Sequence, residues 1–158
     1  MTAQDKSAGQ FKKILFPTDF SSASESALSH ALTIAVKFSA RLYVLHVIDT
    51  SREAAGFYVP HLSYEKLDGE MRAGAKQMLD KFCVSNLRDF EDYEPVILMG
   101  APDVEITNFA RNSGVDLIVM ATHGMSGIER LIFGSTTERV LRKSGCPVLM
   151  VPPSEGGS

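Results

Sequence analysis

The sequence predicts an α/β fold, a single-domain open sheet of five parallel strands with helices on both faces. Five apolar segments of strand length alternate along the chain with four segments that have the residue spacing of amphipathic helices. Such alternation favours a mostly parallel sheet, because each parallel strand needs a crossover connection to the next. The chain has 158 residues, of which 44% are hydrophobic, and this is enough for one domain with a sizeable core.

Two strands and two helices are expected in the first half of the chain. We place the strands at residues 13–16 and 42–47, the helices at about 22–38 and 63–87, and a loop or lid at 50–62. Ser22 and Glu25 fit a capping box at the start of the first helix. The second helix keeps apolar residues at helical spacing despite Gly69 and Gly74 within it.

Three strands and two helices are expected in the second half. We place the strands at residues 95–99, 117–120 and 147–151, and the helices at 102 to about 112 and at 135–144. Pro102 suits the first turn of its helix, and Gly114 suits the end of it. The run at 117–120 is rich in branched apolar residues, which is typical of a strand buried on both faces.

Composition excludes several classes of protein. The net charge is −3 and no basic stripe is visible, which argues against a nucleic-acid binder. Cys83 and Cys146 lie far apart without a CxxC pattern, so a disulfide framework or a zinc site is not expected. The first ten residues lack the apolar core of a signal peptide, and the longest apolar runs are strand-sized. We therefore expect a cytoplasmic protein.

The stretch from residue 115 to 137 predicts an anion site. Its strand ends at Ala121, Gly124 follows, and nine residues later Gly134 and Ser135 stand at the head of the last helix. Backbone N–H groups point outward at a helix N-terminus, the helix dipole favours negative charge, and glycine lets a ligand approach the backbone. Our interpretation is that this loop holds the phosphates of a nucleotide.

A purely structural interpretation of the same stretch stays open. Ser135 and Glu138 fit a capping box, and Gly124 and Gly127 could serve tight turns. Two enzyme motifs are absent from the sequence. The P-loop pattern G-x-x-x-x-G-K-[ST] has no lysine in the required place, and the nucleophile elbow G-x-S-x-G fails because the glycine after Ser126 comes one residue early.

The residues at the carboxyl end of the first strand form the other side of the predicted crevice. Ligands of open α/β sheets bind outside the carboxyl ends of the strands, where the strand order reverses. If the first and fourth strands are neighbours, Pro17, Thr18 and Asp19 face Ala121 and the residues up to 124 across that crevice.

Four charged or titratable residues have two interpretations each. Asp19 could bind base, ribose or Mg²⁺, or could hold a turn before the first helix. His123 could be a phosphate ligand or general acid, or could bond to the backbone; His46 reads as a core histidine with its bonds satisfied. Arg130 could reach phosphates or be solvated. No nucleophile is paired with a base, so any hydrolysis of a bound nucleotide is expected to be slow.

Three motifs together resemble the universal stress protein family. They are K-K-I-L-F-P-T-D-F-S, L-H-V-I-D and A-T-H-G-M-S-G-x6-G-S-T-T, in the family's order. The resemblance covers residues 11–152 and implies an adenine-nucleotide α-hydrolase-like sheet in the order 3-2-1-4-5, usually in a dimer. We expect residues 1–10 and 153–158 to be disordered tails of this domain.

The resemblance extends to the G-x-x-G-x9-G-[ST] signature of the branch that binds ATP. Gly124, Gly134 and Ser135 match its last three fixed places, and Ala121 replaces the first glycine with one extra methyl group that could crowd the ribose. The likeness implies that Pro17, Thr18 and Asp19 line ribose and base, that Val47 meets adenine through its backbone, and that Ser135, Thr136 and Thr137 hold phosphates. Met120, Ala121, His123 and Gly124 complete the expected cofactor-binding set.

The leading functional hypothesis is an ATP-binding regulatory protein of the stress response that acts as a nucleotide-sensing dimer. Its cofactor would be ATP or another adenine nucleotide with Mg²⁺, Asp19 being the candidate metal ligand. The homodimer would pair residues 147–151, a short apolar strand expected at the sheet edge. The alternatives are a slow ATPase or adenylate-handling enzyme, and a nucleotide-free module that binds another protein.

Overall fold

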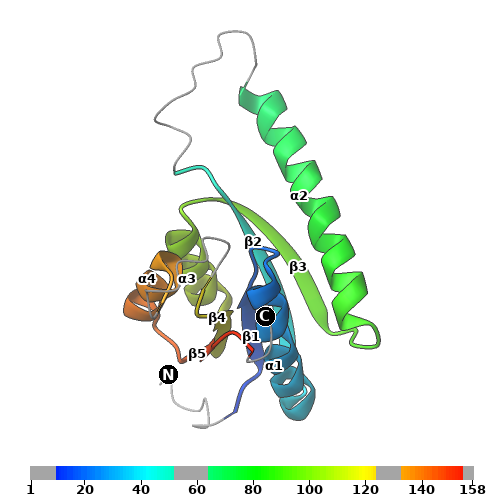
Figure 1. Cartoon of the computed structure of the whole chain (residues 1–158), viewed down its shortest axis with the longest axis vertical. Coiled ribbons are helices and arrows are strands. Elements are labelled where there is room, and N and C mark those ends of the chain that lie inside the picture. Colours follow the sequence, from blue (N-terminus) through cyan, green and yellow to red (C-terminus); the bar gives the residue numbers. More distant parts are fainter. Residues whose placement is uncertain (1–9, 52–63, 124–132, 155–158) are drawn as a thin grey trace, which may run out of the picture.

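The computed structural model describes residues 10–51, 64–123 and 133–154, and within these ranges the chain forms one parallel sheet with helices on both faces (Figure 1). The elements are β1 (Lys13–Pro17), α1 (Ser22–Phe38), β2 (Arg41–Asp49), α2 (Tyr64–Leu87), β3 (Tyr93–Gly100), α3 (Pro102–Ser113), β4 (Leu117–Ala121), α4 (Ser135–Lys143) and β5 (Val148–Val151). Every strand and helix expected from the sequence is confirmed, and the boundaries differ by two residues or fewer.

The sheet has the order β3-β2-β1-β4-β5, as predicted. All four pairs of neighbouring strands are parallel. β1 lies between β2 and β4, with Ile14 opposite Leu117 and Leu15 opposite Ile118. The strand order therefore reverses at the boundary between β1 and β4, where parallel α/β sheets bind their ligands.

Two apolar layers enclose the sheet. Residues of α1 and α2 pack with Phe16 and Val119 in the first cluster, whereas residues of α3 and α4 pack with Leu15 and Ile118 in the second. Adjacent strand residues thus point to opposite faces, and both faces are covered, which explains the unbroken apolar runs in the sequence. Figure 1 shows α3 and α4 together on one side of the sheet, away from α2.

The helix ends show which sequence signals were correct. Pro102 is the first residue of α3, and Gly114 closes that helix with φ of +66°, as expected. The capping box at Ser22 and Glu25 is wrong. The residue that caps α1 is Ser21, whose side chain accepts a hydrogen bond from the backbone N–H of Ser24 at 3.2 Å. Ser21, one position before Ser22, has the extended backbone that a capping residue requires.

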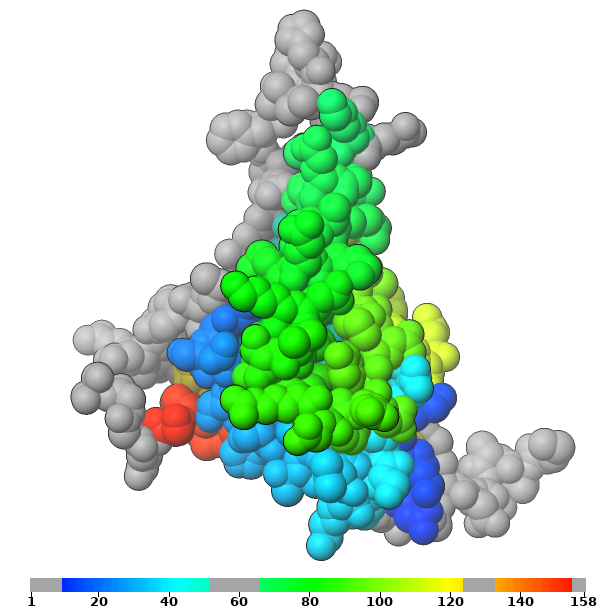
Figure 2. Space-filling model, turned by 90° about the vertical axis from the view of Figure 1, so that its right-hand side faces the viewer, coloured from blue at the N-terminus to red at the C-terminus, as the bar shows by residue number. Residues whose placement is uncertain are grey.

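α2 covers the face of the molecule that Figure 2 presents, drawn there in green. Gly69 and Gly74 sit within it, and a side-chain carbon added at either would meet nothing within 4 Å, so neither glycine is required by close packing. Val84 is 71% exposed on this helix.

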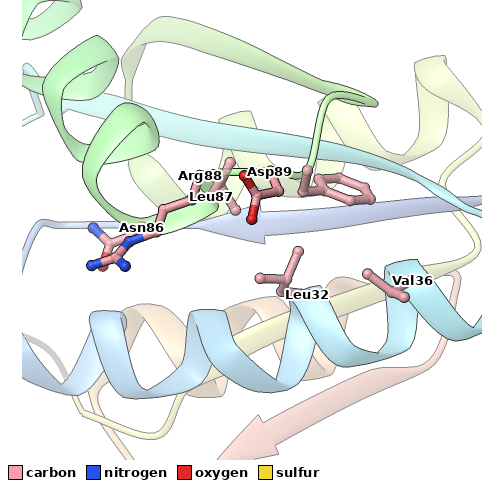
Figure 3. A pocket seen from close by; sticks show the side chains of 7 residues that line it. Leu32, Val36, Asn86, Leu87, Arg88 and Asp89 are labelled. Atoms are coloured by element: carbon pink, nitrogen blue, oxygen red, sulfur yellow. The ribbon is translucent and has the colours of Figure 1, made fainter.

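A hollow of about 340 Å³ lies between α1 and the end of α2, lined on its apolar side by Leu32, Val36 and Leu87 (Figure 3).

Several expectations concern residues that the structure does not describe. They are most of the proposed tails at 1–10 and 153–158, most of the loop at 50–62, and Gly124, Ser126, Gly127 and Arg130. Among the residues that are described, no helix is both long and apolar enough to cross a membrane.

Candidate functional site

The candidate site lies where β1 and β4 end side by side. β4 continues into Thr122, whose backbone N–H donates to the carbonyl of Val151 at 3.0 Å and whose own carbonyl accepts from the N–H of Gly134 at 2.7 Å. The second bond brings the start of α4 back to the end of β4. Because β1 and β4 are parallel neighbours, the turn at Thr18 and Asp19 lies at the same carboxyl end of the sheet as the end of β4.

Among residues 10–51, 64–123 and 133–154, no side chain caps the start of α4. Gly134 occupies the cap position, and Ser135 is the first helical residue. The capping box of Ser135 with Glu138 is therefore wrong, because a capping serine must precede the helix. Glu138 instead pairs with Arg142 at 2.7 Å. The positive end of the α4 dipole thus lies beside the end of β4, and none of the described carboxylates or hydroxyls caps it.

Gly134 has φ of −66° and ψ of 158°, a conformation open to every residue type. The backbone angles at this position therefore do not require glycine. What glycine still contributes here is the absence of a side chain next to the helix N-terminus, which would let an anion approach the backbone closely.

The first three residues of α4 differ in what they can offer a phosphate. Ser135 is exposed and Thr136 is half-buried. Thr137 is buried, and its hydroxyl donates a hydrogen bond to the carbonyl oxygen of Ala121 at 3.0 Å. The hydroxyl hydrogen of Thr137 is therefore engaged within the protein, and this side chain joins α4 to β4.

Three of the expected ligand-contacting residues are strand residues whose side chains pack in the core. Met120 is buried in the second cluster, and Val47 packs against that cluster. Ala121 packs against the first cluster, on the opposite face of the sheet. Any hydrogen bond that these three residues make to a base or ribose would therefore use their backbone atoms. The extra methyl group of Ala121 is used in packing.

The turn after Pro17 is tightly bonded. Thr18 is buried, its N–H donates to the carbonyl of Leu45 at 2.8 Å, and its Oγ1 accepts from Ser24 Oγ at 2.6 Å. Asp19 Oδ1 accepts a hydrogen bond from the N–H of Ser21 at 3.0 Å. The turn role considered for Asp19 is thus present, and it fixes the direction in which this carboxylate leaves the strand.

The two histidines near the site make different contacts. His46 Nδ1 lies 2.8 Å from the carbonyl oxygen of Thr18, and its ring lies 4.5 Å from that of Phe20. His46 therefore has the bonded nitrogen that was expected, but it is half-buried and belongs to neither core cluster. His123 Nδ1 lies 3.0 Å from Thr122 Oγ1, so it bonds to a neighbouring side chain as well as lying next to the glycine loop.

An ion pair holds the other end of α4. Lys143 Nζ donates to Asp103 Oδ2 at 2.6 Å, and the carboxylate side chain is only 7% exposed. This hydrogen bond, with smaller contributions from the charges of Lys143 and Arg139, holds the pKa of Asp103 below its ordinary value. The pair joins α3 to α4 and helps to fix the axis along which the α4 dipole points.

Sequence reasoning did not single out Phe20, Ser24 or Thr122. Phe20 has φ of +64°, which is uncommon for a residue other than glycine and has no signature in sequence. Thr122 is buried directly after β4, and its position in the A-T-H-G motif was the available signal. The described residues contain no group of three His, Cys, Asp or Glu that could hold a metal ion.

The chain forms a doubly wound α/β domain, and the start of α4 lies beside the end of β4, next to the point where the strand order reverses. The chain belongs to the universal stress protein family, whose sequence model matches residues 10–152. It is 35% identical over 147 residues to universal stress protein MJ0531 of Methanocaldococcus jannaschii, covering 89% of this chain and 82% of that protein. It is 32% identical over 146 residues to YxiE of Bacillus subtilis, covering 89% and 99%.

Solved structures share the architecture. The structure of MJ0577, also from Methanocaldococcus jannaschii, superposes with a TM-score of 0.77 at 31% identity, covering 93% of this chain and 99% of that one. A universal stress protein in complex with cAMP has a TM-score of 0.62 at 24% identity, covering 92% and 99%. At that identity the second likeness concerns the fold alone. The family and the strand order expected from the sequence are confirmed.

Proposed function

We propose that this protein binds an adenine nucleotide, with ATP as the leading ligand, and acts as a nucleotide-sensing dimer in the stress response. The observation that carries the proposal is the start of α4. It lies against the end of β4 through the bond from Gly134 to Thr122, and no side chain in the described part of the chain caps it. An uncapped helix N-terminus at the reversal point of a parallel sheet is an electrostatic and hydrogen-bonding match for phosphate.

The phosphates would lie at the first turn of α4. In this proposal the backbone N–H groups after Gly134 and the hydroxyls of Ser135 and Thr136 donate to phosphate oxygens. Thr137 would contribute its backbone while its hydroxyl stays with Ala121. Gly124, Met120 and His123 belong to the same proposed site, and Gly124 lies outside the described residues.

The base and ribose would lie across the boundary between β1 and β4. Pro17 ends β1 and Thr18 follows it, and the backbone of Val47, near the end of β2, would pair with the adenine edge. Asp19 leads away from this edge and would accept hydrogen bonds from ribose or, with Mg²⁺ present, contribute a carboxylate oxygen to the cation. These assignments follow from the family signature and from the position of each residue at the sheet edge.

Binding rather than turnover is the proposed role. A phosphoryl-transfer enzyme needs a group that activates the attacking nucleophile. The expected cofactor-binding set contributes hydroxyls, backbone groups and His123, and His123 is bonded to Thr122. The second candidate, a slow ATPase, is favoured by no specific contact, and release of inorganic phosphate from ATP with Mg²⁺ would measure it directly.

The dimer in this proposal pairs the edge strand β5 with its mate. β5 is the last strand of the sheet, and Leu149 on it is 37% exposed. An exposed apolar edge is open to pairing with a second copy unless something covers it. A nucleotide bound at β4 and α4 would lie one strand away from this interface, which is how occupancy could influence the dimer.

The test is to identify small molecules carried by the purified protein. The protein is denatured, and the released material is analysed by mass spectrometry; we expect an adenine nucleotide. ATP, AMP and cyclic AMP are then titrated separately with and without Mg²⁺, cyclic AMP being included because a universal stress protein of this fold has been crystallised with it. Release of no nucleotide, together with no binding of any of the three, would leave the protein-interaction module as the better account.

A further inference from the structure

His46 connects the end of β2 to the turn that follows β1. Its Nδ1 lies 2.8 Å from the carbonyl oxygen of Thr18. A carbonyl oxygen only accepts, so Nδ1 is the donor and carries the hydrogen. The backbone N–H of Thr18 donates to the carbonyl of Leu45 at 2.8 Å, so both backbone groups of Thr18 are bonded to β2. The imidazole thus continues the parallel ladder by one bond after β1 has left it.

The same imidazole supports Phe20. The two rings lie 4.5 Å apart and are tilted by 34°, and Phe82 of α2 packs edge-on against Phe20 at 5.8 Å. Phe20 has φ of +64°. A left-handed backbone is unfavourable for an aromatic residue and persists only where the surroundings hold it. Here the surroundings are His46, Phe82 and the hydroxyl of Thr18, which accepts from the N–H of Phe20 at 3.0 Å.

Asp19 is the residue between these two fixed points. Its predecessor is held through both backbone groups, and its successor is held through its ring and its N–H. The backbone of Asp19 therefore has little freedom, although the turn lies at the edge of the sheet. Strain maintained at one defined turn by a neighbouring side chain is a feature of binding sites that are organised before the ligand arrives.

We propose that His46 is the positioning residue for the base and ribose end of the nucleotide site. Its N–H holds the carbonyl of Thr18, so that Thr18 and Asp19 are presented in one conformation. This inference rests on the proposed function and assigns to His46 no contact with the ligand. The phosphate end of the site, at the start of α4, does not depend on His46.

Two substitutions separate the bond from the bulk of the ring. His46→Phe keeps an aromatic ring against Phe20 and removes the N–H donor. His46→Asn keeps a donor, because its side-chain nitrogen is as many bonds from the backbone as Nδ1, and removes the ring. If the bond to Thr18 positions the turn, the asparagine variant rescues binding and the phenylalanine variant does not.

The readout is the dissociation constant for ATP compared with that for inorganic triphosphate, measured by calorimetry well below the unfolding midpoint of each variant. We expect His46→Phe to raise the dissociation constant for ATP by about five- to tenfold, the factor associated with one hydrogen bond. Triphosphate binding should change by less than about twofold, and His46→Asn should bind both within about twofold of wild type.

The outcomes separate this inference from the proposed function. If wild type and His46→Phe bind ATP with equal affinity, the positioning role is overturned and the proposed nucleotide site still stands. An equal loss of ATP and triphosphate in His46→Phe means a general structural role and also overturns the inference. A His46→Asn variant as weak as His46→Phe excludes the bond to Thr18 as the cause. A wild type that binds neither ATP nor AMP overturns the proposed function and the inference together.

Discussion

The hydroxyl of Thr137 donates its hydrogen to the carbonyl oxygen of Ala121 across 3.0 Å, and this bond joins the first turn of α4 to the last residue of β4. Thr137 is 4% exposed. Thr137→Val keeps the shape of the side chain and leaves that carbonyl without its partner, which should lower the free energy of unfolding by about 1–3 kcal/mol. Thr137→Ser keeps the hydroxyl and is the control. Equal loss in both variants in urea unfolding would show that the bond contributes nothing.

Ala121 stands at the first position of the glycine signature, and its methyl group packs against the first cluster. We therefore expect Ala121→Gly to leave the dissociation constant for ATP within about twofold of wild type, while backbone freedom and lost packing lower stability by about 1 kcal/mol or more. Isothermal titration and thermal unfolding measure the two effects separately. Binding that tightens fivefold or more, about 1 kcal/mol, would mean that the methyl group crowds the ligand after all.

The ion pair of Lys143 with Asp103 gives the protein a defined dependence of stability on pH. Because the pKa of Asp103 is lowered in the folded state, the contribution is present above the unfolded pKa of roughly 3.9 and is lost as the pH falls through the folded-state pKa. Lys143→Met should cost about 1–2 kcal/mol at neutral pH, since it leaves a carboxylate that is 7% exposed without its cation.

Arg142 provides the control for that change. It pairs with Glu138 one turn earlier on α4, and both side chains are at least half exposed. Arg142→Met should therefore change the free energy of unfolding by roughly 0.5 kcal/mol or less. Urea unfolding of wild type and both variants across acidic to neutral pH makes the comparison. A cost for Lys143→Met that does not shrink at acidic pH would exclude Asp103 as its source.

The edge strand β5 is the predicted dimer interface. Leu149→Lys places a charge on the exposed edge and should shift the protein toward monomer in sedimentation experiments. Val84→Lys adds the same charge on α2, where Val84 is more exposed than Leu149, and should leave the oligomeric state unchanged. A wild type that sediments as a monomer at micromolar concentration would argue against the interface, as would a dimer that Leu149→Lys leaves intact.

Local patterns in the sequence predicted the fold well, because strand and helix periodicities are properties of neighbouring residues. The boundaries of α1 and the closing role of Gly114 follow from such patterns. Side-chain capping was harder to predict. Ser21 and Ser22 are chemically identical, and only the backbone angles of the folded chain select the cap. Similarly, nothing in the residue type of Gly134 tells that its φ is negative.

The parts of the site that sequence did not predict depend on contacts between distant segments. Lys143 reaches Asp103 from 40 positions away, and no local pattern in the sequence indicates this ion pair. Phe20 adopts its left-handed backbone because His46 and Phe82 hold its ring, and these residues meet only in the folded sheet. Motifs predict where the site lies, and tertiary contacts determine the shape of that region.

The central claim is that the start of α4 binds the phosphates of an adenine nucleotide, and Gly134 is the residue at which to test it. Valine there places branched carbons in the path of the phosphates. Since φ of −66° and ψ of 158° suit any residue, the substitution adds no backbone strain of its own. Gly145→Val is the matched control after the other end of α4, where an added side-chain carbon meets nothing within 4 Å. Ser135→Ala should give a partial effect, because it removes one hydroxyl and keeps the backbone donors.

The measurement is the shift of the thermal unfolding midpoint on adding ATP with Mg²⁺. Ligand at about 100 times its dissociation constant stabilises the folded state by about 2.7 kcal/mol, which corresponds to about 5–10 °C for a domain of this size. We predict that wild type and Gly145→Val show this shift in full and that Gly134→Val loses most of it while remaining folded. An equal shift in wild type and Gly134→Val would contradict the account, because the phosphates would then be bound somewhere other than the start of α4.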